Sequence, residues 1–589
     1  MKRFFTYLLA SILGVILASM LIFLITIGII SAIVASQDKP VEIGDNSVLQ
    51  LKLDKPIRDR KPSLPFLVIN PSRFRADNQI GLNDLLNNIA KASADEKIKG
   101  IFLDLSSLNA GIATVEEIRN ALADFSKSGK FTVSFSEGYS QKAYYLASAG
   151  DKIYMNPGGN IALTGLRAEI LFYKKTLEKL DIKPEIIRHG KFKSAVEPLM
   201  YDKMSPENRN QIRSYIGSIW EHMCSQISED RDVPVGRLNS IADSLLLWNA
   251  SSAVSFGMID TILYRDQVMD TLARLARVDK PRDLKLITHQ KYLKVPKHRE
   301  DKVYTRNKIA VIYAEGDIYM GDPGEGNIGS ASLSKTIRNA REDSTIKAIV
   351  FRVNSGGGSA MAAEVIWREI YLAHQVKPVI ASLGDVAASG GYYIVTAADT
   401  IVANPNSITG SIGVFGILMD ASGFFENKLG ITTDVERTNS YSDFGSIYRP
   451  LAGTERTVIQ KSVDEIYTTF VNRVSEGRDL SYESVDQIAE GRVWSGISAA
   501  GLKLVDVTGG LSKAIELAAA KAHLDHYRIV ELPRIEDPFS QIMKEFTGDA
   551  TDRMLRRELG ENYRYFQYMK NLIGGDRIQA RLPFDISVD

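Results

Sequence analysis

The sequence predicts an α/β protein in which one N-terminal transmembrane helix precedes two tandem copies of a single domain. Three observations lead to this fold class: an uncharged apolar run near the N-terminus, a self-similarity at an offset of 248 residues, and short β-branched runs that alternate with segments of helical period. The length of 589 residues agrees with this organisation, because it is far too long for one ordinary domain.

The apolar run Phe4–Gln37 contains no charged residue and exceeds the roughly 20 apolar residues that cross a bilayer. Lys2 and Arg3 precede it and mainly acidic residues follow, so the positive-inside rule leaves a short stub in the cytoplasm. We therefore expect a single-pass protein of the cytoplasmic (inner) membrane whose folded domains lie on the exported, periplasmic side. A cleaved signal peptide is the alternative, although its apolar core is typically only about 7–15 residues long.

The repeat is clearest in two segments. Residues 95–105 align with 343–353, and residues 144–157 align with 392–405. Seven of the fourteen positions in the second pair are identical, which chance rarely gives at a fixed offset. We predict four parts: a membrane anchor at 1–45, a first repeat at 46–295, a second repeat at 305–535 and a C-terminal appendage at 536–589. The seam between the repeats is the polar stretch around 294–306.

Within the second repeat, strands and a helix alternate. The predicted strands are 309–313, 348–353, 379–383 and 400–403, and the predicted helix is 360–373. Such alternation indicates parallel βαβ units with the sheet covered by helices. The appendage has no counterpart in the first repeat; it opens with a helix-like run from 537 to about 557 and closes with an extended segment at 579–588.

Composition excludes several classes of function. Lysine plus arginine (72) nearly cancels aspartate plus glutamate (71), which argues against nucleic-acid binding through a general basic surface. Cys224 is the one cysteine, so neither an intramolecular disulfide nor a multi-cysteine metal cluster can form. The seven histidines lack metal-ligand spacing. We therefore expect no metal, cofactor or nucleic-acid partner.

Two glycine-rich turns in the second repeat stand out as candidate sites. Asn354-Ser-Gly-Gly-Gly-Ser359 follows a predicted strand directly and opens a helix, so its backbone N–H groups face any negative charge placed there. A phosphate cradle, half of an oxyanion hole and a plain tight turn all remain open, although the spacing matches no phosphate-binding motif. In Gly384-Asp-Val-Ala-Ala-Ser-Gly-Gly-Tyr-Tyr393, Ser389 sits among small residues before a helix, and Gly390 offers an N–H.

Comparing the repeats strengthens the case for Ser389. In the first repeat, Gln141 stands at the position of Ser389, and residues 108–110 carry no glycine. The first repeat instead holds Lys193, in Gly190-Lys-Phe-Lys-Ser-Ala-Val-Glu-Pro198, where the second repeat has Ser442. If the repeats pack face to face, one Ser–Lys pair forms across their interface.

A Ser–Lys pair is chemically plausible. A serine hydroxyl needs a base to take its proton, and lysine is a base only when neutral. The ordinary lysine pKa of about 10.4 leaves little neutral amine at pH 7, but apolar burial lowers it. The apolar neighbours of Lys193 fit such a setting. Lys191, two residues earlier, remains a rival that periodicity alone does not dismiss.

These motifs resemble the signal peptide peptidase A family, also called protease IV, in its long, duplicated, membrane-anchored form. The resemblance covers nearly the whole chain, and most specifically residues 193–198 and 384–393. It implies a Clp-protease/crotonase-like ββα superhelix in each repeat. It also implies a homotetramer whose active sites line an enclosed bowl, and peptide substrates that are signal-peptide remnants left in the membrane.

The resemblance also implies roles for individual residues. Ser389 is the nucleophile, Lys193 the general base and Ser411 the hydroxyl that orients the lysine. Gly390 and Gly357 form the oxyanion hole, with Gly358 as the alternative to Gly357. One departure is Gly356, which stands where the family usually has proline and makes the turn less pre-organised.

The leading hypothesis is therefore a membrane-anchored serine endopeptidase, with a Ser-Lys dyad, for short unfolded apolar peptides. A crotonase-type acyl-CoA enzyme is one alternative, because the same fold and glycines serve that chemistry. It explains neither Ser389 nor Lys193. A non-catalytic, membrane-tethered peptide-binding scaffold is the other, but random decay need not leave one complete catalytic set.

Overall fold

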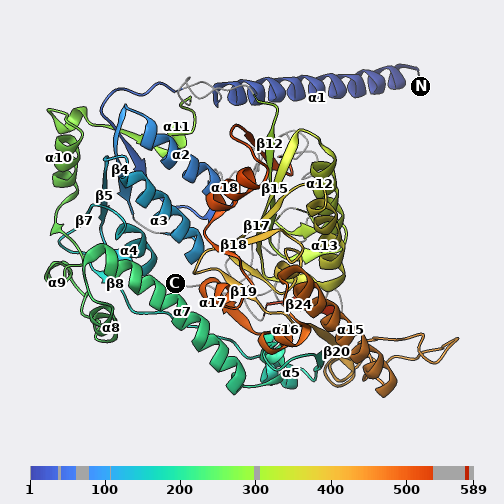
Figure 1. Ribbon diagram of the computed structural model, residues 1–589. Coiled ribbons are helices and arrows are strands. Elements are labelled where there is room, and N and C mark those ends of the chain that lie inside the picture. Colours follow the sequence, from blue (N-terminus) through green and yellow to red (C-terminus); the bar gives the residue numbers. More distant parts are fainter. Residues whose placement is uncertain are drawn as a thin grey trace.

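Two α/β units of the same architecture pack against each other in the computed structural model of the protein (Figure 1). The structure describes residues 2–37, 41–61, 79–105, 108–296, 305–324, 326–534 and 578–582. The N-terminal helix α1 (Lys2–Gln37) runs along the top edge of the view in Figure 1, outside the sheets of both units. By length and hydropathy together, no helix among the described residues qualifies as a membrane span.

The first repeat begins directly after α1. Its elements in chain order are β1 (Ser47–Leu51), β2 (Ile57–Arg58), β3 (Ile80–Gly81), α2 (Leu82–Ala94), β4 (Ile98–Asp104), α3 (Ile112–Ser126), β5 (Phe131–Ser136), β6 (Tyr139–Ser140), α4 (Gln141–Ala147), β7 (Lys152–Met155), β8 (Ile161–Ala162), α5 (Lys174–Lys179), β9 (Lys183–Arg188), α6 (Glu197–Met200), α7 (Pro206–Arg231), α8 (Val235–Asp243), α9 (Ala250–Ser255), β10 (Thr261–Ile262), α10 (Arg265–Leu275), β11 (Lys285–Thr288) and α11 (His289–Tyr292).

The second repeat follows a similar order, although β16 and β21 have no counterpart in the first repeat. Its elements are β12 (Lys308–Glu315), β13 (Ile318–Tyr319), β14 (Ile328–Gly329), α12 (Ser330–Glu342), β15 (Ile346–Ser355), β16 (Gly357–Ser359), α13 (Ala360–His374), β17 (Val379–Ala388), α14 (Gly390–Tyr393), β18 (Thr400–Ala403), β19 (Ile408–Gly410), β20 (Phe415–Asp420), α15 (Gly453–Arg478), α16 (Tyr482–Ile488), β21 (Val493–Ser495), α17 (Gly496–Gly501), β22 (Val507–Thr508), α18 (Leu511–Lys521) and β23 (Arg528–Leu532). Near the C-terminus lies β24 (Ile578–Arg581).

Each repeat is built on a mainly parallel sheet; the exception is β21 of the second repeat, which pairs antiparallel with β19. The first sheet runs β10-β7-β5-β4-β1-β11, and the second runs β21-β19-β17-β15-β12-β23 with β18 also paired to β17. Their central strands are rich in β-branched residues and buried along almost their whole length, as expected when helices cover both faces. The α/β tandem architecture predicted from the sequence is confirmed.

The offset found in the sequence reappears in the structure. Helices α2 and α12 begin at Leu82 and Ser330, 248 positions apart. The long helices α7 and α15 each have 26 residues, and each ends at an aspartate in the left-handed conformation, Asp232 and Asp479. All four predicted strands and the predicted helix of the second repeat are confirmed, as β12, β15, β17, β18 and α13, with ends extended by a few residues.

A third sheet joins the repeats, in the order β14-β13-β16-β24-β20-β9. Strand β9 of the first repeat pairs antiparallel with β20 of the second over their full lengths, from Lys183↔Asp420 to Arg188↔Phe415. The chain that leaves β9 therefore enters the second repeat. The predicted appendage contributes β24 to this sheet. Three predicted segments lie outside the described residues: the helix at 537–557, most of the seam between the repeats, and residues 583–588 of the extended segment.

A buried cluster of charged side chains also links the two repeats. Arg352 on β15 hydrogen-bonds Asp59 (2.7 Å) and Glu117 (2.7 Å) of the first repeat, and all three side chains are at most 3% exposed. Asp385, from the Ser389 motif, accepts hydrogen bonds from the Thr114 N–H (2.9 Å) and hydroxyl (2.6 Å) in the first turn of α3. Asp385 thus caps a helix of the other repeat.

Candidate active site

Lys193 and Ser389 meet across the interface between the repeats. Lys193 Nζ lies 2.6 Å from Ser389 Oγ, although 196 residues separate them in the chain. Both side chains are 0% exposed. The complementary pattern of the two repeats in the sequence thus corresponds to a direct contact in space.

The pairing of β9 with β20 positions Lys193 beside Ser389 of the second repeat. The chain turns after Arg188, and the amides that flank Lys193 are then fixed by both repeats: Phe192 N–H donates to Glu490 O of the second repeat (3.0 Å). Gln211, on α7 of the first repeat, donates to Phe192 O (3.0 Å) and Ser194 Oγ (2.8 Å) and accepts from Val493 N–H (3.2 Å). Lys193 is therefore held from both sides.

Ser389 stands at the turn between β17 and α14. Its backbone has φ +56° and ψ −119°, a conformation that non-glycine residues rarely adopt. The hydrogen bond from Ser389 N–H to Gly410 O (2.8 Å) helps to hold this turn. Strain of this kind persists only where the surroundings impose it, and it concentrates at functional sites.

The environment of Lys193 favours the neutral amine. Burial lowers the pKa of Lys193 well below its ordinary value, and no carboxylate in the described part of the chain offsets that effect. Nζ also lies 3.0 Å from both Ser411 O and Ser411 Oγ. A neutral amine has two N–H donors and one lone pair. Its donors can serve the two Ser411 oxygens, so its lone pair faces the Ser389 hydroxyl.

Ser411, expected to orient the lysine, thus lies within hydrogen-bond distance of Nζ. It is buried, has φ +50°, and donates its N–H to Arg492 O (2.6 Å). The rival base Lys191 lies elsewhere: it is exposed and pairs with Glu490 at 3.6 Å. The structure brings Lys193, Ser389 and Ser411 together and leaves Lys191 on the surface.

The glycine turn lies beside Ser389, as an oxyanion hole requires. A Cβ added to Gly357 would lie 2.7 Å from Gly390 N, so these two backbones touch. The expected donor Gly357, however, already gives its N–H to Ser355 Oγ (3.1 Å). Gly358 pairs with Ala580 of β24 instead. The choice between Gly357 and Gly358 as the second oxyanion-hole donor stays a prediction.

The first repeat has lost the corresponding site. Gln141 is buried, and its Oε1 accepts the N–H groups of Thr164 and Gly165 (both 3.0 Å). The Gln141 side chain therefore holds a loop in place, whereas the hydroxyl of Ser389 at the equivalent position of the second repeat contacts Lys193. Ser442, at the position of Lys193, is exposed and closes a local turn with Asn439. Each chain holds one Ser–Lys pair within its described residues.

Sequence reasoning missed two residues that position the lysine, Gln211 and Gly491. Gly491 has φ +85°, and an added Cβ would lie 2.6 Å from the backbone N and Cα of Lys193. Neither residue belongs to a recognisable motif. Only the contact between distant segments reveals them.

Replacing Gly491 with alanine is expected to lower kcat by about 10–100-fold, because a clash with the Lys193 backbone displaces Nζ and misplacement by 1 Å can cost about 10²-fold. Turnover of a fluorogenic peptide measures this effect. The matched control is Gly430→Ala, where φ is +67° but an added Cβ meets nothing within 4 Å. Equal losses in both variants would show that backbone strain, and not the contact with Lys193, is responsible.

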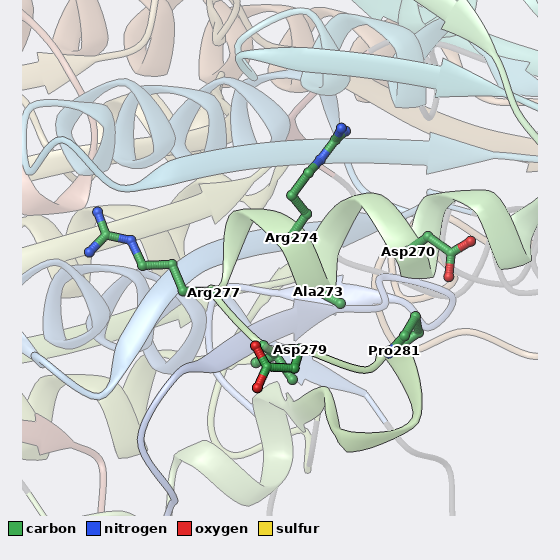
Figure 2. Close-up of a pocket in the computed structure, with 7 residues that line it drawn as sticks. Asp270, Ala273, Arg274, Arg277, Asp279 and Pro281 are labelled. Carbon is green, nitrogen blue, oxygen red and sulfur yellow. The ribbon is translucent and has the colours of Figure 1, made fainter.

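A surface pocket elsewhere on the first repeat offers no competing site. Residues from Asp270 to Pro281, on α10 and the turn after it, line this pocket (Figure 2). Its charged side chains do not converge: Arg274 and Arg277 point in different directions. Across the described ranges, no three His, Cys, Asp or Glu side chains gather as metal ligands.

Comparison with known proteins identifies the family. The model of Peptidase family S49 matches residues 124–279 and 372–525, once in each repeat. Protease 4 of Haemophilus influenzae is 35% identical over 452 residues (75% of this chain, 73% of the relative), and Protease 4 of Salmonella typhi is 36% identical over 490 residues (80% and 76%). The chloroplastic serine protease SPPA of Arabidopsis thaliana is 32% identical over 503 residues (83% and 73%).

Among solved structures, a point mutant of ClpP1 from Listeria monocytogenes aligns with 35% of this chain and 94% of its own, with 15% identity and a TM-score of 0.24. The family assignment does not depend on this alignment, because the family model matches both repeats and the relatives align with most of the chain. The chain belongs to Peptidase family S49.

Proposed function

We propose that this peptidase is a membrane-anchored serine endopeptidase in which Ser389 is the nucleophile and Lys193 the general base. The observation that carries the proposal is the 2.6 Å contact between Lys193 Nζ and Ser389 Oγ inside a fully buried, uncompensated lysine site. A lysine held this way is a base at neutral pH, whereas an ordinary surface lysine is an ammonium ion.

The reaction follows from this geometry. Ser389 Oγ attacks the substrate carbonyl carbon while its proton moves to Lys193 Nζ, and the two oxygens of Ser411 hold the resulting ammonium. Lys193 then gives the proton to the leaving amine. Water repeats the sequence on the acyl-enzyme. Backbone N–H groups of Gly390 and of the 356–358 turn stabilise the oxyanion, a contribution typically worth about 10²–10³ in kcat for each donor.

The proposed substrates are signal-peptide remnants and other short, unfolded, apolar peptides. The family resemblance and the uncharged run Phe4–Gln37, which would hold the enzyme at the inner membrane with its repeats on the periplasmic side, support this choice. Carbonate extraction tests the tether: the full chain is expected in the membrane fraction, and a chain starting at residue 46 in the soluble fraction. Release of the full chain would contradict it.

We also propose that four copies of the chain assemble into a homotetramer. In the first repeat, β9 reaches across to the second, but the corresponding part of the second repeat, residues 429–448, projects outward (Figure 1). It exposes a set of large apolar side chains: Leu429, Ile431, Val435, Tyr441, Ile447 and Tyr448. Such a patch suits an interface with the first repeat of a second copy. Light scattering of the detergent-solubilised chain measures the number of copies.

The experiment for the proposed function is hydrolysis of a synthetic signal peptide by the detergent-solubilised full chain. The expected result is endoproteolytic cleavage of the free peptide and no cleavage of a folded protein. A folded chain that binds the peptide but never cleaves it would support a scaffold instead. Retention on a CoA matrix, with no peptide cleavage, would support an acyl-CoA enzyme.

The pH profile should report Lys193 directly. We expect kcat/KM to fall about tenfold per pH unit below the lowered pKa of Lys193, because protonation removes the base. Between that pKa and the unfolded value of about 10.4 the unfolded chain binds the extra proton, so this group makes stability rise with pH. An acid limb centred near 10.4 would contradict the proposed role of burial.

A further inference from the structure

The motif that supplies Lys193 also contains a buried glutamate that the proposed reaction does not use. Glu197 is 0% exposed. Its carboxylate accepts hydrogen bonds from Ser205 Oγ (2.5 Å), Ser205 N–H (3.2 Å) and Asn208 Nδ2 (2.8 Å), all of them neutral donors. Ser205 is the N-cap of α7, so the carboxylate lies at the positive end of that helix. Taking a carboxylate out of water is costly, and its place beside the lysine motif therefore needs a physical explanation.

A chain of buried side chains connects Glu197 to the general base. Asn208 Oδ1 accepts a hydrogen bond from Gln211 Nε2 (3.1 Å), and the same nitrogen contacts oxygen atoms of the two residues that flank Lys193. Asn208 and Gln211 are each 1% exposed. The chain ends in the second repeat, where Val493 N–H donates to Gln211 Oε1 (3.2 Å). We refer to Glu197, Asn208 and Gln211 as the polar chain.

Glu197 sets the direction of the hydrogen bonds along the polar chain. An ionised carboxylate only accepts, so Asn208 turns its NH2 group toward Glu197 and its carbonyl oxygen toward Gln211. Gln211 then presents its NH2 group to Asn208 and to the lysine segment, which leaves its carbonyl oxygen for Val493 N–H. In the opposite orientation, an NH2 group of Gln211 would meet Val493 N–H, and the link to the second repeat would be lost.

The second repeat, which has no lysine at the corresponding place, also lacks the polar chain. By the offset that pairs Lys193 with Ser442, and by the equal lengths of α7 and α15, the three positions carry Ser446, Glu455 and Val458. Glu455 accepts the N–H of Ala452 in its own helix cap (2.8 Å), and Val458 is 50% exposed. Within the described residues, the polar chain thus accompanies the lysine.

We propose that Glu197 is a positioning residue for the general base, Lys193. Its carboxylate orients Asn208 and Gln211, and Gln211 ties the backbone on both sides of the lysine to the second repeat, where Ser389 lies. The proposal rests on the proposed function of the Ser–Lys pair. Loss of Glu197 is expected to move Lys193 Nζ away from Ser389 Oγ, which slows proton transfer and leaves the binding of substrate nearly unchanged.

The effect of Glu197 is one of geometry rather than charge. Burial is what lowers the pKa of Lys193, and no carboxylate in the described part of the chain opposes that shift. Glu197 contacts Ser205 and Asn208 and does not contact the lysine amine. Any influence on Lys193 therefore passes through Asn208 and Gln211, and a double-mutant cycle isolates that route.

The cycle combines Glu197→Ala with Gln211→Ala in the full chain. Its readout is the rate at which a phosphonofluoridate modifies Ser389. Glu197→Ala is expected to slow modification about 10–100-fold, because misplacing a reacting group by 1 Å can cost about 10²-fold. In a chain that already carries Gln211→Ala, the same change should slow it at most about twofold further. Asn208→Ala should behave like Glu197→Ala in both backgrounds, and it replaces that variant if Glu197→Ala does not fold.

Two further variants and one kinetic constant separate positioning from a general loss of structure. Glu369→Ala is the matched control: this carboxylate is also buried, pairs with Arg338 and Arg341 on α12, and should not affect the rate when removed. Glu197→Gln keeps the shape and one acceptor oxygen, so at least about a third of the rate should remain. In hydrolysis of a fluorogenic peptide, Glu197→Ala should lower kcat and leave KM within about twofold.

Equal slowing by Glu197→Ala with and without Gln211→Ala would overturn the proposal. It would also be overturned by equal slowing in Glu369→Ala, by a Glu197→Gln chain as slow as Glu197→Ala, or by a loss confined to KM. If the cycle behaves as expected but no variant hydrolyses peptides, the proposed function is refuted and the positioning role stands. A modification rate that does not depend on Lys193 would refute both.

Discussion

Replacing either Lys193 or Ser389 with alanine is expected to reduce kcat by about 10⁴-fold or more, with KM nearly unchanged. The two side chains act as one unit, so removal of either abolishes proton transfer from the Ser389 hydroxyl. The fully buried positions mean that water replaces neither group efficiently. Turnover of a fluorogenic apolar peptide, measured under single-turnover and steady-state conditions, gives both effects.

Lys191→Ala is the matched control for Lys193→Ala. It removes a lysine from the same turn, but its side chain is exposed and contacts Glu490 rather than Ser389. We expect this variant to keep at least about half of the activity, since exposed ion pairs contribute little. A Lys191→Ala enzyme as inactive as Lys193→Ala would mean that the turn, and not the buried amine, controls catalysis.

Replacing Arg352 with methionine is expected to lower the free energy of unfolding by about 3–5 kcal/mol, the largest stability effect we predict. Arg352 is the one cation bonded to both Asp59 and Glu117 among the described residues, and its loss leaves these two carboxylates of the first repeat buried without their cationic partner. Burial already raises the pKa of Glu117. Urea unfolding, followed by far-UV circular dichroism, measures the loss.

The sign of the pH dependence provides a second check on Arg352→Met. Loss of the guanidinium raises the pKa of the buried Glu117 carboxyl further above that in the unfolded chain, so the folded variant binds more protons and its stability falls as pH rises. The deficit should therefore be smaller at pH 5 than at pH 8. Arg456→Met, which breaks the exposed inter-repeat pair with Glu185, should cost at most about 1 kcal/mol. Similar losses in the two variants would contradict the cluster's role.

The repeat made much of the fold predictable. Because strands and helices recur at one offset, the elements of the second repeat follow from their β-branched and helical patterns, and the structure agrees to within a few residues. Because the first repeat carries the lysine and the second the serine, the sequence also predicted Lys193 and Ser389 as a pair. Local pattern and comparison between the copies were enough for this step.

Long-range contacts were not predictable in the same way. Gln211 and Gly491 hold the lysine through backbone atoms, and such contacts require no distinctive residue type or spacing. Asp385 lies within the Ser389 motif, yet it caps α3 of the other repeat. Gly357 donates its N–H to Ser355 within its own turn, and the strand β24 joins its sheet from far along the chain.

The most direct test of the central claim, that a lysine of the first repeat activates a serine of the second, is the rate at which a phosphonofluoridate modifies Ser389 at neutral pH. Peptide mapping identifies the modified residue, and the Lys193→Ala chain retains the serine, so its reactivity remains measurable. We predict modification of Ser389 in the unmodified chain and in Lys191→Ala at similar rates, and at least about 10³-fold slower modification in Lys193→Ala. Equal rates in all three chains, with each folded and assembled, would contradict the claim.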